Sequence, residues 1–126
     1  MNVAELVAID VHTHAEVSSR DPKDEATQSF EAAAKKYFKE TAPRPTISEA
    51  AAYYRARKIA CIIFTVDSEK ATGRRRISNE EVAELANANS DVMIPFASID
   101  PARGKMGARE AHRLIKENAA KLLKLA

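Results

Sequence analysis

The chain has 126 residues and a net charge of +2, which is enough for one domain with a hydrophobic core and too few for two ordinary domains. The small charge, the single short basic run at residues 74–76 and the lack of any apolar stretch of about 20 residues argue against nucleic acid, membrane surfaces and membrane spans as partners. A single cysteine, Cys61, excludes an intramolecular disulfide, and no secretory leader is visible, so we expect one cytoplasmic domain over residues 1–126.

The first half of the chain predicts one strand followed by two helices. The apolar run at residues 6–9, continued by polar residues to position 14, is typical of a buried strand with a polar end. Apolar side chains then recur at helical spacing over residues 27–40 and 46–58, and two prolines between these segments separate the helices. The apolar stripe expected on the first helix consists of Phe30, Ala34, Tyr37 and Phe38.

Strands and helices alternate in the second half of the chain. Strands are expected at residues 59–66 and 92–99. Helices are expected at residues 78–88, which open with the capping-box pattern S-N-E-E, and from about residue 105 towards 125. This alternation predicts an α/β fold with about three parallel strands and flanking helices, whose chemistry lies at the carboxyl ends of the strands.

The segment Asp10-Val11-His12-Thr13-His14 carries the strongest chemical signal in the chain. Side chains alternate along a strand, so Asp10, His12 and His14 are expected to share one face. Two imidazoles on Cα atoms about 6.5–7 Å apart can converge on one cation, and nitrogen ligands favour zinc or manganese over magnesium. We therefore predict that His12 and His14 hold a divalent metal, while Asp10 orients a histidine or is a weak third ligand. The alternative is that both histidines simply line a polar rim.

Carboxylates also follow the other two expected strands. Asp67 comes directly after the second strand, and Asp100 comes directly after the third. Both are candidate substrate-binding residues, because side chains at the ends of parallel strands line the mouth of such folds. Turn formation competes with this interpretation, since Asp-Ser and Asp-Pro pairs commonly leave a strand.

Two motifs resemble a known family. Residues 9–14, I-D-V-H-T-H, are similar to the first-strand motif of the amidohydrolase superfamily. Residues 94–101, I-P-F-A-S-I-D-P, followed by Gly104 and by A-H-R-L-I at 111–115, are similar to the branch that contains aminocarboxymuconate-semialdehyde decarboxylase and the resorcylate decarboxylases. Together the resembling segments span most of the chain.

The resemblance implies a TIM-type (β/α) barrel with a metal, commonly zinc, bound by His12 and His14. In that family further histidine ligands follow the fifth and sixth strands, and a catalytic aspartate follows the eighth. A complete barrel takes about 250 residues, so we expect the N-terminal portion of one, either truncated or completed by another chain. The remaining histidine, His112, matches no ligand motif and is expected on the surface of the last helix.

The function implied is metal-dependent hydrolysis of a small organic acid or cyclic substrate, in which the metal polarises the substrate and activates water. Non-oxidative decarboxylation within the same family and a catalytically inactive barrel fragment are the alternatives. A nucleotide-binding domain would need a glycine-rich loop after the first strand, and residues 15–19 contain no glycine.

Association between copies is also expected. A short parallel sheet cut from a barrel has open edges and a bare apolar face, both of which favour pairing with another chain. We therefore predict a homo-oligomer, most simply a two-fold dimer, whose interface includes the sheet and the C-terminal leucines Leu122, Leu123 and Leu125.

Overall fold

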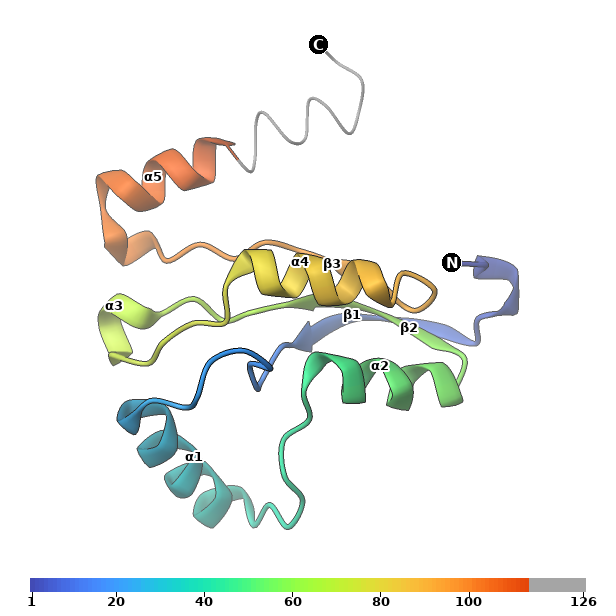
Figure 1. Ribbon diagram of the computed structural model, residues 1–126, viewed down its shortest axis with the longest axis horizontal. Coiled ribbons are helices and arrows are strands. Elements are labelled where there is room, and N and C mark those ends of the chain that lie inside the picture. Colours follow the sequence, from blue (N-terminus) through green and yellow to red (C-terminus); the bar gives the residue numbers. More distant parts are fainter. Residues whose placement is uncertain (114–126) are drawn as a thin grey trace.

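The computed structural model describes residues 1–113 and has an α/β fold with an open, three-stranded parallel sheet (Figure 1). The strands are β1 (Ala8–His14), β2 (Ile59–Phe64) and β3 (Met93–Pro95), and they lie in sequence order, with β2 in the middle. The predicted parallel sheet with flanking helices is therefore confirmed. β3 is shorter than the expected 92–99, because its pairing with β2 runs only from Met93 to Pro95 and closes with the hydrogen bond from the Phe96 N–H to Ile63 O (2.9 Å).

Two helices, α2 (Ile47–Ala56) and α4 (Asn79–Ala88), pack against the same face of the sheet and against each other. Apolar side chains from both helices meet those of β2 and β3 to form the core. Its most buried members are Ile47, Ala51, Cys61, Ile63, Val82, Ala86 and Met93. We call this side of the sheet the covered face.

The other side, here called the open face, carries Ile9, His12, His14, Ile62 and Phe64. Apart from Ala60, which pairs with Ile9 and is fully buried, its side chains are less well buried than those of the covered face. Ile9 is 43% exposed, whereas Ile63 on the covered face has no exposed surface. Paired residues in parallel strands point to the same side, so the pairing of His14 with Phe64 and of Thr13 with Ile63 assigns these residues to opposite faces.

A β-bulge interrupts β1 between Asp10 and Thr13. One extra residue in β1 shifts the alternation of side chains, as bulges do. Asp10 pairs with Cys61 and Thr13 pairs with Ile63, so both lie on the covered face although they are three residues apart. The expectation that Asp10 shares a face with the two histidines is therefore wrong, because strict alternation holds only in a regular strand.

The capping of the helices differs from the pattern expected in the sequence. Ser78 accepts a hydrogen bond from the backbone N–H of Glu81, but the Glu81 carboxylate turns away and binds Ser18 Oγ (2.8 Å) and the Ser19 N–H (2.7 Å). The reciprocal capping box occurs instead at the start of α2, between Thr46 and Glu49. Burying Glu81 ties the loop after β1 to α4.

Helix α1 (Glu25–Phe38) lies to one side of the sheet, near the carboxyl ends of the strands (Figure 1). Of its expected apolar stripe only Ala34 is buried, whereas Phe30, Phe38 and Tyr37 are 44%, 67% and 80% exposed. Most of the stripe is uncovered within the described residues, where α1 is attached through the cap at its N-terminal end. Asp24 caps the helix and accepts the Arg75 N–H.

The remaining elements also gather near the carboxyl ends of the strands (Figure 1). They are the short helix α3 (Glu69–Thr72), the 3-10 turn η2 (Pro101–Arg103) and α5 (Lys105–His112); a further turn, η1 (Val3–Glu5), precedes β1. The predicted continuation of the last helix and its terminal leucines lie outside the described residues. Between positions 1 and 113 no helix has the length and apolar character needed to cross a membrane.

Candidate metal-binding site and adjoining pocket

His12 and His14 lie side by side at the carboxyl end of β1 on the open face. Their ring centroids are 4.8 Å apart, with an angle of 58° between the ring planes. Both rings stand edge-on to the ring of Phe64, at centroid distances of 5.5 Å for His12 and 4.9 Å for His14. The predicted pairing of the two histidines on one face is thus confirmed, and Phe64 limits the directions in which the imidazoles can turn.

The spacing of these rings fits a shared metal. Two imidazoles bound to one tetrahedral metal through bonds of about 2.0–2.1 Å have centroids roughly 5 Å apart, close to the 4.8 Å that separates His12 and His14. No cluster of three or more His, Cys, Asp or Glu side chains occurs among residues 1–113. The described part of the chain therefore offers two neighbouring nitrogen ligands, and a complete site needs ligands from elsewhere.

Both carboxylate oxygens of Asp10 accept hydrogen bonds on the covered face. Its Oδ1 accepts the His12 backbone N–H at 3.0 Å, and its Oδ2 accepts the Tyr54 hydroxyl at 2.7 Å, while Tyr54 also contacts Thr13 Oγ1. The His12 N–H and then the Tyr54 hydroxyl lower the pKa of Asp10 below its ordinary value, because both stabilise the carboxylate. Asp10 therefore stabilises the bulge that turns His12 to the open face.

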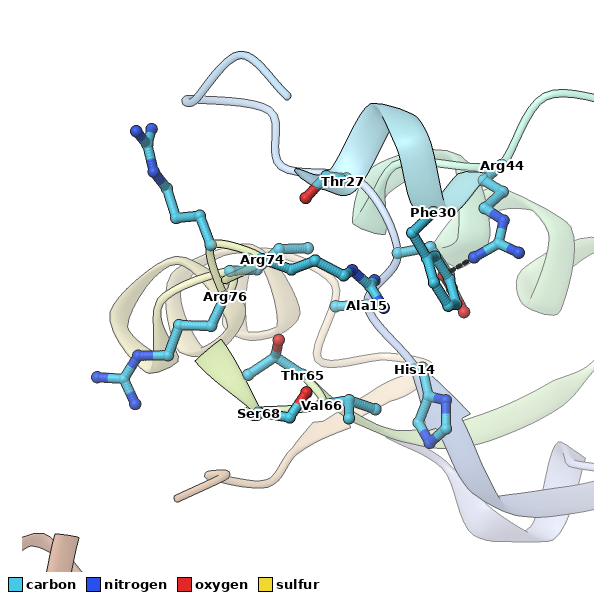
Figure 2. Close-up of a pocket in the computed structure, with 13 residues that line it drawn as sticks. His14, Ala15, Thr27, Phe30, Arg44, Thr65, Val66, Ser68, Arg74 and Arg76 are labelled. Carbon is cyan, nitrogen blue, oxygen red and sulfur yellow. Dashed lines mark hydrogen bonds and ion pairs between the residues drawn. The ribbon is translucent and has the colours of Figure 1, made fainter. Parts of the chain in front are cut away.

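A pocket of about 240 Å³ adjoins His14 at the carboxyl ends of β1 and β2 (Figure 2). Its walls come from the ends of both strands, from α1 and from the loop that follows α3. The apolar part includes Ala15, Phe30, Val66 and Ile77, and the basic part consists of Arg44, Arg74, Arg75 and Arg76. Glu16 is the acidic member of the lining, so the charge around the cavity is net positive, which favours an anionic occupant.

Three of these arginines already have carboxylate partners, of which the longest pair joins Arg75 to Asp21 at 3.9 Å. Arg44 binds Glu16 (2.7 Å) and Glu40 (3.1 Å), and Glu40 and Glu16 raise its pKa. Arg76 binds the buried Asp67 and, at 3.4 Å, Glu110 of α5. Its side chain points away from the pocket (Figure 2). These pairs brace the walls of the pocket.

The two predicted substrate-binding carboxylates lie outside the lining of this pocket. Asp67 is buried beneath Arg76, and its Oδ1 has no hydrogen-bond partner within the described residues. Asp100 is also buried; it accepts the Lys70 and Ala102 N–H groups, each at 2.8 Å. Each carboxylate thus has a structural role that links neighbouring loops, and its contact with a substrate stays a prediction.

The basic lining of the pocket was missed by sequence reasoning, which favours a solvated loop for a run of three arginines. The signal that could have indicated this lining was the position of the three arginines in the chain. Residues 74–76 follow the second strand, at the end of a parallel sheet where ligands bind. Arg44 carried no comparable signal, because it reaches the pocket only through the path of the chain between α1 and α2.

Comparisons of the chain with protein-family models, curated proteins and solved structures find no match.

Proposed function

We propose that this chain forms the first three strand–helix units of an amidohydrolase-type barrel and contributes to metal-dependent hydrolysis of a small organic acid or cyclic substrate. The observation that carries the proposal is the pair His12 and His14, whose rings lie 4.8 Å apart at the carboxyl end of the first strand. The sequential strand order, with α2 and α4 on one face, is also what such a barrel requires.

In this proposal His12 and His14 hold the metal, and Phe64 and the bulge at Asp10 fix the direction of the imidazoles. A bound zinc or manganese ion would supply a Lewis acid and an activated water. The remaining ligands and the proton-transfer group come from outside the described residues. The chain's own pocket, directly beside His14, binds the substrate and excludes part of the solvent.

The basic lining of the pocket supports an acidic substrate. Such a substrate is compatible with hydrolysis and with decarboxylation, because in both reactions a carboxylate would lie next to the metal. The absence of a third ligand within residues 1–113 supports the alternative of an inactive fragment. In both cases the open face, with Ile9, Ile62 and Phe64, would be covered by further strands or by a second copy of the chain.

Calorimetric titration of the full chain with zinc chloride tests the metal site. We expect one zinc ion to bind to each pair of His12 and His14. The double variant His12→Ala, His14→Ala should abolish zinc uptake, because no described cluster replaces these ligands. His112→Ala is the matched control, since His112 is exposed on α5 and should leave uptake unchanged. Equal zinc binding by the wild type and the double variant would refute the proposal. Sedimentation equilibrium on the same samples tests the expected homo-oligomer.

A further inference from the structure

Arg74 differs from the other arginines around the pocket. Its guanidinium lies over the ring of Phe30, with Cζ 3.8 Å from the ring centroid, and its buried Nε has no hydrogen-bond partner among residues 1–113. Figure 2 shows the side chain extended across the pocket towards Phe30, whereas Arg76 points away. An arginine that lines a cavity, is held in one position and has no ion pair among residues 1–113 can receive an anionic ligand at its guanidinium.

The neighbouring carboxylates do not neutralise Arg74. Glu16, which lines the pocket, binds Arg44, while Asp67 binds Arg76 and Asp21 contacts Arg75. Within the described residues Arg74 forms no ion pair, although each of these three neighbours does. The cavity beside it therefore has an excess of positive charge.

The backbone explains how Arg74 reaches this position. Gly73 ends α3 in the left-handed conformation, with φ of +70°, and donates its N–H to Glu69 O. A left-handed residue after a helix reverses the chain direction, and glycine adopts this conformation without a steric penalty. The next residue, Arg74, thus turns back towards α1, where Phe30 fixes its guanidinium.

We propose that Arg74 binds the carboxylate of a small apolar carboxylic acid in this pocket, with Phe30 as the platform that holds the guanidinium in place. A carboxylate accepts two parallel hydrogen bonds from a guanidinium, and the apolar lining residues Ala15, Val66 and Ile77 provide room for the body of the acid. The proposal narrows the substrate class of the proposed function. It depends on that function for the reaction of the bound acid, but not for the binding of the acid to Arg74.

Titration of the full chain with benzoate, monitored by NMR at the Arg74 Nε–H, tests the inference. We expect a saturable shift with benzoate and none with benzamide, which has the same shape without the charge. Arg74→Gln should weaken benzoate binding about tenfold or more, because it removes a charge-assisted pair of hydrogen bonds. Arg74→Lys, which keeps the charge but loses the planar fork, should bind with intermediate strength.

Arg57→Gln is the matched control, because Arg57 also stacks on an aromatic ring, that of Tyr53, but does not line this pocket. It should bind benzoate as the wild type does. Unchanged binding by Arg74→Gln, equal binding of benzamide, or no saturable shift in the wild type would each overturn the inference. Benzoate binding to the wild type should persist in the presence of EDTA, so a failure of the metal site leaves this result intact and is recognised separately.

Discussion

The two faces of the sheet are built from neighbouring residues but differ in what they do. On the covered face Ile63 and Cys61 are fully buried between α2 and α4, and burial raises the pKa of the Cys61 thiol to about 11. On the open face, the adjacent Phe64 stands beside two histidines that remain accessible. The packed core that stabilises the fold therefore lies on one side of β2, and the candidate metal ligands lie on the other.

The strongest test of this division compares two adjacent isoleucines. Ile63→Ala should lower the free energy of unfolding by about 2–5 kcal/mol, because it opens a cavity in the core. Ile62→Ala removes the same atoms from the partly exposed open face and should cost less than half as much. Urea unfolding of both variants measures the difference. Equal losses would mean that the open face is as well packed as the covered face.

A smaller effect is expected where the loop after β1 meets α4. Glu81→Ala should cost about 1–3 kcal/mol, because it leaves the Ser18 hydroxyl and the Ser19 N–H without their buried acceptor. Glu84→Ala, on the same helix, breaks an exposed ion pair with Arg20 and should cost less than Glu81→Ala, because solvent screens the pair. Thermal unfolding compares the two, and a larger loss in Glu84→Ala would contradict the structural role given to Glu81.

The sequence predicts the parallel sheet and the two packed helices because apolar spacing is a local property. It also predicts the neighbouring histidines, since regular alternation holds from His12 to His14 although it is broken between Asp10 and His12. The bulge itself was not predictable, because it depends on Tyr54, which is 44 residues away from Asp10 and binds it across the covered face. Pocket formation was likewise missed, because Arg44 and Arg74 meet only after folding.

The smallest effect concerns the bulge and its pH dependence. Tyr54→Phe removes a donor to Asp10, so the pKa of Asp10 should rise towards its ordinary value. A lowered carboxyl pKa stabilises the fold above the unfolded value, about 3.9, and this contribution is lost as pH falls through the folded pKa. The stability difference between wild type and Tyr54→Phe should therefore shrink below about pH 4. Denaturant unfolding across pH measures it.

Tyr53→Phe is the control for this experiment, because Tyr53 is exposed on the same helix and does not contact Asp10. It should leave both the pKa of Asp10 and the pH dependence unchanged. A pKa of Asp10 that is the same in Tyr54→Phe and wild type would show that the tyrosine does not hold the bulge.

The most direct test of the central claim is the NMR response of the histidine ring nitrogens to zinc. If the open face carries a metal site, the imidazole signals of His12 and His14 should shift together with a single midpoint, while those of His112 stay in place. The two ring centroids are 4.8 Å apart, so one ion can reach both imidazoles. Separate midpoints for His12 and His14, or shifts no larger than those of His112, would contradict the assignment of a shared metal site.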